Sequence, residues 1–225
     1  MRDDQPYPVA DLSDGPEDSD LDLDLAPVEN LLTPARLGWS LLVLGLVGFA
    51  ASLALSIEKV LKLADPDHVA SCSINIFLDC SVAMGSWQGA LLGFPNSFVG
   101  VAAFPVVVTT GVVLLTGARL PRWYWLSLFT GVVVACGLVV FLVHTSVSVL
   151  GKLCPYCMVV WVAVLPLVVH VGTYVVQERF LPAPERLRAF LVANRSIVVV
   201  VLYVLVIVWV AIGLGPAIAD HVRYA

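Results

Sequence analysis

The chain has 225 residues, of which 60% are apolar and only 13% are charged, and its mean hydropathy is +0.94. These values exclude an ordinary soluble domain, because several apolar runs reach the roughly 20 residues that a helix needs to cross a bilayer core. The net charge of −5 comes from an acidic N-terminal stretch, and no basic patch indicates nucleic-acid binding, so we expect no nucleic-acid partner. Because unpaired backbone groups are costly in lipid, we expect an all-α integral membrane protein.

Residues 1–35 are acidic and contain too little apolar surface to fold, so we expect a disordered cytoplasmic tail. A transmembrane domain follows over residues 36–220. Five apolar runs within it are expected to span the membrane, at about 37–57, 97–117, 124–150, 154–177 and 196–219.

The connections between these runs differ in length. A loop over residues 62–96 carries two cysteines, and its short apolar end, 86–93, is expected to form a half-helix in the membrane interface. Residues 151–153 form a very short turn, and a polar loop is expected over 178–195. With the N-terminus inside, eight of the twelve Arg and Lys residues lie on the inner side. We therefore expect a cytoplasmic N-terminus, with the cysteine loop and Lys152 outside, in a bacterial cell (inner) membrane.

Four of the five cysteines map to this outer side, where disulfides persist if the compartment is oxidising. They form two groups, Cys72 with Cys80 and Cys154 with Cys157. The fifth, Cys136, lies alone near the middle of the third run, and we expect it to act as a small apolar residue.

The sharpest motif is Cys154-Pro155-Tyr156-Cys157, a C-x-x-C pair that opens a helix. Helix N-termini favour thiolates, and Pro155 fits a first helical turn, so we interpret the pair as a redox dithiol. Half of a zinc site, completed by Cys72, Cys80 and His68, is one alternative, and an inert structural disulfide is another.

Seven residues separate Cys72 from Cys80, a spacing that is unspecific by itself. The position of this pair is more informative than its spacing, because the loop that carries it can fold over the C-x-x-C pair. Two such pairs on one face form a relay, since a thiolate attacks a disulfide and passes the electrons on. The alternative is a static staple of the loop.

The order of these features resembles the vitamin K epoxide reductase family, over roughly residues 37–174. The segment from Cys80 to Ser97 is similar to the bacterial branch, in a form without a fused thioredoxin-like domain. The positions that match the family pattern are Cys72, Cys80, Ser86, Asn96, Cys154 and Cys157. The resemblance implies a four-helix transmembrane bundle around a quinone, menaquinone or ubiquinone, plus a fifth transmembrane helix.

The resemblance also implies roles. Cys72 would face a partner, Cys80 would shuttle electrons to Cys154, and Cys157 would be the thiolate beside the quinone. Asn96 would donate a hydrogen bond to a quinone carbonyl, with a plain helix N-cap as the alternative. Ser86 would order the loop chemistry or merely form a turn.

One position departs from the animal vitamin K reductases, which have Tyr where this chain has Trp161. Trp161 keeps an aromatic wall one turn from Cys157 but lacks the hydroxyl, so quinone binding is expected and epoxide reduction is not. We therefore expect a quinone-dependent thiol-disulfide oxidoreductase that reoxidises a DsbA-like thioredoxin-fold protein. The alternatives are a vitamin K epoxide reductase of the endoplasmic reticulum type and a non-catalytic protein with stapling disulfides.

The fifth run ends six residues before the end of the chain, which is too short a segment for a further domain. We therefore expect the DsbA-like donor to act in trans, as a separate protein.

Overall fold

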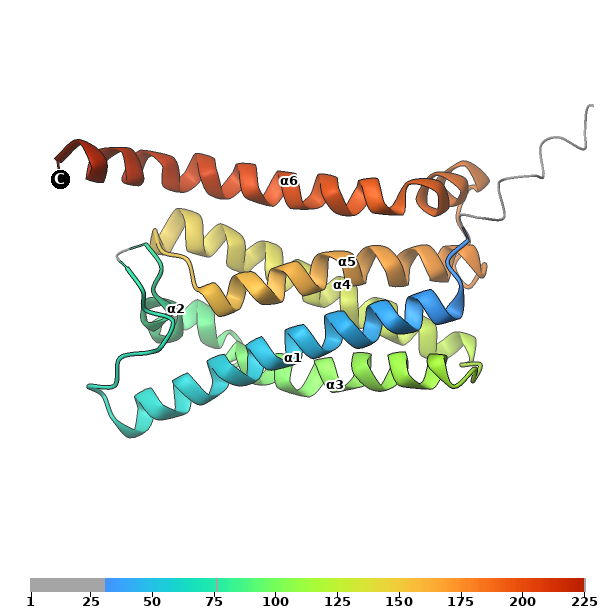
Figure 1. The fold of residues 1–225 in the computed structure, drawn as a ribbon, viewed down its shortest axis with the longest axis horizontal. Helices are drawn as coiled ribbons and strands as arrows, with labels where there is room; N and C mark the ends of the chain where they lie inside the picture. Colours follow the sequence, from blue (N-terminus) through green and yellow to red (C-terminus); the bar gives the residue numbers. More distant parts are fainter. Residues whose placement is uncertain (1–30, 76, 225) are drawn as a thin grey trace, which may run out of the picture. The chain divides into compact units, whose positions relative to one another are not determined.

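The computed structural model describes residues 31–75 and 77–224, with side chains through residue 215. Within this part of the chain, five helices are long and apolar enough to cross a membrane, which confirms the expected all-α membrane architecture. They are α1 (Pro34–Ala64), α3 (Asn96–Leu115), α4 (Arg122–Thr145), which the π-helical turn η4 (Ser146–Leu150) continues, α5 (Pro155–Gln177) and α6 (Glu185–Tyr224). The short α2 (Cys80–Gly85) and the 3-10 helix η3 (Trp87–Ala90) lie between α1 and α3 (Figure 1).

Helix α1 starts before the expected span and ends after it. Thr33 caps it, accepting a hydrogen bond from the Arg36 N–H, and Pro34 occupies the first turn, where its missing N–H costs nothing. Most of the predicted tail, residues 1–35, lies outside the described residues. The Gln177 side chain of α5 bonds both the N–H and the carbonyl of Leu32, at 2.9 and 3.2 Å, so the start of the described chain is tied to α5.

The closest helix pair is α1 and α3, which approach through glycines. A Cβ atom on Gly111 would lie 2.8 Å from the Gly38 carbonyl oxygen and 2.8 Å from the Leu42 nitrogen. Small residues at such crossings allow backbones to approach closely, which strengthens van der Waals packing in lipid. The pair therefore forms a firm wall of the bundle.

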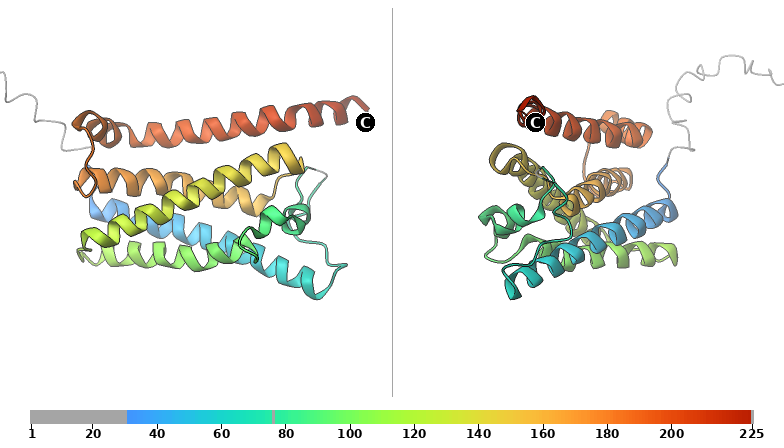
Figure 2. Two further views of the ribbon diagram at one scale, coloured as in Figure 1. Left: turned by 180° about the vertical axis from the view of Figure 1, so that it is seen from behind. Right: turned by 60° about the vertical axis from the view of Figure 1, so that its left-hand side comes forward.

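Helix α5 is the centre of the described unit, because it packs against α1, α4 and α6 and most of its side chains are buried. Helix α6 packs chiefly on α5 (Figure 2). Of its described apolar side chains, all but that of Leu214 are exposed or half-buried. The Tyr203 hydroxyl donates to the Val162 carbonyl at 2.7 Å across this contact. An exposed apolar helix of this kind fits a lipid-facing position.

The polar segment expected as a loop over residues 178–195 is largely helical, so this expectation was wrong. Helix α6 already starts at Glu185 and continues through a kink at Asn194, where φ is −117° and ψ is 17°. Glu185 lies in the first turn, where a carboxylate is favoured, and bonds Arg188 at 3.0 Å. The proline at position 184 precedes this helix rather than interrupting it.

One end of the unit collects the features that matter for function. The last turns of α1, the helices α2 and η3, the start of α3 and the start of α5 all lie there (Figure 1). Of the half-helix expected over 86–93, only the four residues of η3 are helical. Ser86 ends α2, and its side chain caps η3. Cys80 is the first residue of α2, Cys154 caps α5 and Cys157 lies in its first turn, whereas Cys72 lies in the loop between α1 and α2.

Candidate active site

A short backbone pairing aligns the two cysteine motifs. Leu78 and Leu153 form an isolated parallel β-bridge. The Leu153 N–H donates to the Phe77 carbonyl at 2.8 Å, and the Asp79 N–H donates to the Leu153 carbonyl at 3.0 Å. Because Cys80 and Cys154 follow directly after these paired residues, they leave the pairing side by side.

The sulfur atoms follow from this alignment. Cys72 and Cys80 form a disulfide, and Cys154 and Cys157 are free thiols. The Cys80 and Cys154 sulfurs lie 3.2 Å apart, within the buried part of the site. Cys136 is half-buried in the middle of α4 and packs against the apolar core. The structure therefore brings four of the five cysteines together.

Cys154 is the N-cap of α5, and its sulfur accepts the Cys157 backbone N–H at 3.3 Å. The pKa of the Cys154 thiol lies below its ordinary value, chiefly because the Cys157 thiol donates to it and also because backbone N–H groups point at it. The start of α5 therefore favours the thiolate form of Cys154. The thiolate that the resemblance implies at Cys157 stays a prediction.

Asp79 ties the loop to the turn before α5. It accepts hydrogen bonds from the Ser73 hydroxyl at 2.6 Å and the Ser81 N–H at 2.9 Å, and it pairs with the Lys152 ammonium at 3.1 Å. The Ser73 hydroxyl, more than the other partners, lowers the pKa of Asp79 to about 2. These contacts of Asp79, which we call the Asp79–Lys152 clasp, and the backbone pairing together hold Cys80 against Cys154.

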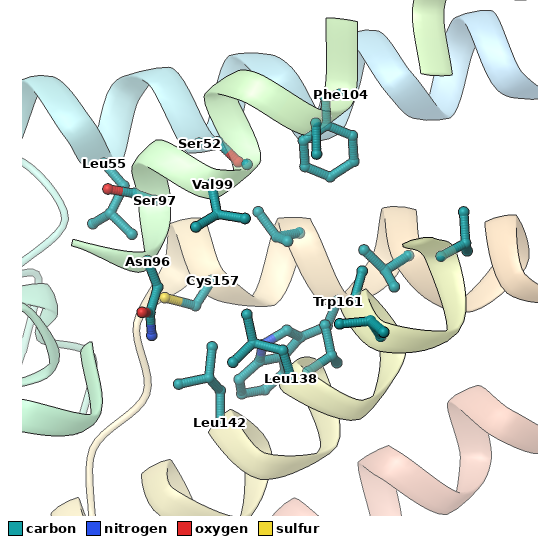
Figure 3. Close-up of a pocket in the computed structure, with 18 of the residues that line it drawn as sticks. Ser52, Leu55, Asn96, Ser97, Val99, Phe104, Leu138, Leu142, Cys157 and Trp161 are labelled. Carbon is teal, nitrogen blue, oxygen red and sulfur yellow. The ribbon is translucent and has the colours of Figure 1, made fainter. Parts of the chain in front are cut away.

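A cavity of about 580 Å³ opens beside Cys157, between α3, α4 and α5. Its walls are almost wholly apolar. Four residues singled out from the sequence line it, namely Ser86, Asn96, Cys157 and Trp161. In Figure 3 the Asn96 amide and the Cys157 sulfur point to the same corner, and Trp161 lies one turn further along α5.

Asn96 is the first residue of α3 but does not cap it, so the N-cap alternative is wrong. Its amide oxygen accepts the Leu91 N–H at 3.1 Å, and its amide nitrogen donates to the Gln88 carbonyl at 2.7 Å. The Ser86 hydroxyl donates to the Ala83 carbonyl and accepts the Gly89 N–H, at 2.8 and 3.2 Å. Both side chains shape the segment that closes this end of the cavity.

The sequence analysis did not predict that some of the residues around the cysteines belong to the site. Asp79 and Lys152 belong to this group, and so does Glu58, a buried carboxylate on α1 that bonds the His68 ring at 2.9 Å. A charged residue directly after an apolar run was the available signal for Glu58. The zinc alternative needed His68, yet in the described part of the chain no three His, Cys, Asp or Glu side chains cluster as metal ligands do.

The profile of the vitamin K epoxide reductase family matches residues 39–172, which include the four paired cysteines, Ser86, Asn96 and Trp161. The chain belongs to this family. The comparison with curated proteins and the comparison with solved structures each found no match. The match to the vitamin K epoxide reductase family runs from α1 into α5 and thus covers the four helices around the cavity. Membership makes the chain a multi-pass membrane redox enzyme.

Proposed function

We propose that this protein oxidises the thiols of a separate, DsbA-like thioredoxin-fold protein and passes the electrons to a membrane quinone, menaquinone or ubiquinone. The observation that carries the proposal is the 3.2 Å approach of the Cys80 and Cys154 sulfurs, beside a cavity that Cys157 lines. A loop staple needs no such approach. A relay needs it, because exchange requires the attacking sulfur to reach the disulfide.

The cavity fits a quinone. Its apolar walls suit a flat ring with an isoprenoid tail, and its polar groups converge at one end, as in most small-molecule sites. The Asn96 amide nitrogen carries two hydrogens, of which one goes to the Gln88 carbonyl and the other serves to bind a quinone carbonyl. A bound quinone accepts two electrons and two protons and leaves as the hydroquinone.

The cavity also has a side opening. Helices α3 and α4 are joined by a short turn yet scarcely touch, while α3 packs tightly on α1. Val106 of α3 and Val134 of α4 line the cavity and are themselves 50% and 67% exposed. An opening lined by exposed valines faces lipid, which is where a quinone is dissolved.

The electron path then runs in balanced steps. A partner thiolate attacks Cys72, and the Cys72–Cys80 disulfide breaks to release the Cys80 thiolate. Cys80 attacks the oxidised C-x-x-C pair at Cys154, which releases Cys157. The second thiolate of the partner attacks the partner–Cys72 disulfide, so the partner leaves with its own disulfide and the Cys72 thiolate is free. Cys72 then attacks Cys80, which restores the loop disulfide and frees Cys154. Cys154 and Cys157 now hold the two electrons and two protons, and they form their own disulfide again when the quinone takes both.

The proposed orientation puts this end of the bundle outside a bacterial cell membrane. Arg and Lys residues gather on the opposite side, at Arg119, Arg122, Arg179, Arg186 and Arg188, as the positive-inside rule requires for a cytoplasmic face. We propose no epoxide reduction, because Trp161 offers the cavity an indole N–H in place of a hydroxyl.

The deciding experiment supplies purified protein in detergent with a reduced thioredoxin-fold donor and a soluble quinone. We expect one quinone consumed for every two donor thiols lost, and no consumption with Cys157→Ser. Cys136→Ser is the matched control and should retain turnover. Donor oxidation without quinone consumption, or quinone consumption that persists in Cys157→Ser, would contradict the proposal.

A further inference from the structure

Glu58 is a carboxylate that the relay does not use, and it lies in the last turns of α1 with only 8% of its surface exposed. Both of its oxygens have donors. Oε2 accepts from the His68 ring at 2.9 Å, and Oε1 accepts from the Ser71 N–H at 3.2 Å and from the Ser71 hydroxyl. A buried carboxylate is costly unless it is paired and hydrogen-bonded, so this set of donors holds His68 and Ser71 in place.

A second hydrogen bond extends the chain to the C-x-x-C motif. The Ser71 and Tyr156 hydroxyl oxygens lie 3.1 Å apart. Because the ionised Glu58 only accepts, the Ser71 proton goes to Glu58, and the Tyr156 hydroxyl donates to Ser71. The direction of the chain is therefore Tyr156 to Ser71 to Glu58.

Glu58, Ser71 and Tyr156 link helix α1 to the two cysteine motifs. Ser71 precedes Cys72 directly, and Tyr156 lies between Cys154 and Cys157. Glu58 lies on α1, which the glycine contacts with α3 hold firmly. One carboxylate on a fixed helix thus sets the position of both motifs.

The same contacts keep the loop closed. Cys72 is only 3% exposed, and Cys80 and Cys154 are buried with it under the loop. A partner thiol must reach Cys72, so the segment from His68 to Cys72 has to move first. Ser71 cannot move without leaving Glu58 and Tyr156.

We propose that Glu58 is a positioning residue for the disulfide exchange, which holds Ser71 and, through it, Tyr156, so that the Cys72–Cys80 disulfide stays closed against Cys154. This inference rests on the proposed function for its kinetic part. Its structural part, protection of the loop disulfide, does not depend on any partner or quinone.

The test measures how fast an anionic water-soluble phosphine reduces the Cys72–Cys80 disulfide, a reaction that consumes one water and yields the phosphine oxide and two thiols. We expect Glu58→Gln to speed it about tenfold, because hydrogen bonds to a charged group are lost, and Tyr156→Phe to speed it about threefold. Asp67→Asn removes one negative charge from an exposed position in the same loop, so it controls for easier approach of the anion.

In the donor assay, Glu58→Gln should lower kcat about tenfold without raising KM for the donor, because alignment is lost while docking is not. Thermal unfolding of each variant shows whether a loss of kcat reflects lost alignment or a destabilised fold. Tyr156→Phe removes only one hydroxyl, so it still tests the inference if Glu58→Gln does not fold. Unchanged phosphine rates in both variants, or an equal increase in Asp67→Asn, would overturn the inference. Faster reduction in a protein whose wild type never consumes quinone would support the loop contact and reject the proposed function alone.

Discussion

The Cys80 sulfur lies 3.2 Å from the Cys154 sulfur although it is bonded to Cys72, so one atom touches both halves of the cysteine site. The contact follows from the backbone pairing of Leu78 with Leu153, which lie two residues before Cys80 and one residue before Cys154. It leads to a first prediction about intermediates.

In a Cys157→Ser variant, Cys154 can attack the Cys72–Cys80 disulfide at Cys80, 3.2 Å away, and release Cys72. The resulting Cys80–Cys154 disulfide should accumulate, because Cys157 is missing to attack it at Cys154 and alkylation of Cys72 blocks the reverse step. Mass spectrometry of the digested, alkylated protein measures the cross-linked peptide. Cys136→Ser, half-buried in α4, is the control and should show none. A Cys72–Cys154 peptide instead would exchange the roles of the two loop cysteines.

A Cys80→Ser variant should trap the donor. In this variant Cys72 is a free thiol, so it attacks the disulfide of the oxidised donor and forms a mixed disulfide with it. No second loop thiol remains to release this bond, so the adduct should persist under non-reducing conditions. Electrophoresis with and without reductant would detect the adduct. An adduct that forms with Cys72→Ser and not with Cys80→Ser would show that the donor meets Cys80 first.

Asn96 should control quinone affinity. Asn96→Asp keeps an oxygen for the Leu91 N–H but loses the amide donor to the quinone and to the Gln88 carbonyl. KM for the quinone should therefore rise about tenfold, and the thermal midpoint should fall as well. Steady-state kinetics at saturating donor measure this. Ser97→Ala, at a neighbouring cavity position, is the matched control. A KM that is unchanged in Asn96→Asp would remove Asn96 from the quinone site.

The Asp79–Lys152 clasp should contribute to stability over a defined pH range. The folded-state pKa of Asp79 is depressed to about 2, so its stabilisation is present in full above the ordinary carboxyl range and is lost as pH falls toward 2. Unfolding of the wild type and Asp79→Asn, followed from pH 8 to pH 2, should therefore show a constant difference above about pH 5 that disappears near pH 2. A difference that grows on acidification would contradict the assignment.

The proposed orientation predicts selective labelling. After reduction of intact cells, a membrane-impermeant thiol reagent should modify Cys72 when the loop opens, and Cys136 should react only after denaturation. Mass spectrometry of the labelled peptides distinguishes the two. Labelling of Cys72 that requires permeabilised cells would place the cysteine end in the cytoplasm.

The sequence predicted the membrane helices because each depends on a local run of apolar residues, and it predicted the C-x-x-C pair at a helix start because Cys154 and Pro155 are local signals. It placed Asn96 at the start of α3 but missed its real contacts, since Gln88 and Leu91 depend on how the loop folds back. Asp79 with Lys152, and Glu58 with Ser71, are pairs brought together by the course of one irregular loop. The hydrophobic periodicity of a sequence does not predict the path of an irregular loop. The helical segment that starts at Glu185 was predicted as a loop because it is rich in charged residues and follows a proline.

The side opening between α3 and α4 has a consequence for how such an enzyme is assayed. A reactant that enters from lipid is encountered at its mole fraction in the membrane, not at its concentration in the whole sample. At saturating donor, diluting vesicles with buffer would leave turnover per enzyme unchanged, whereas diluting the quinone with added lipid, at the same total amount, would slow it. In the proposed reaction, the bilayer is thus the volume that sets the effective concentration of the quinone.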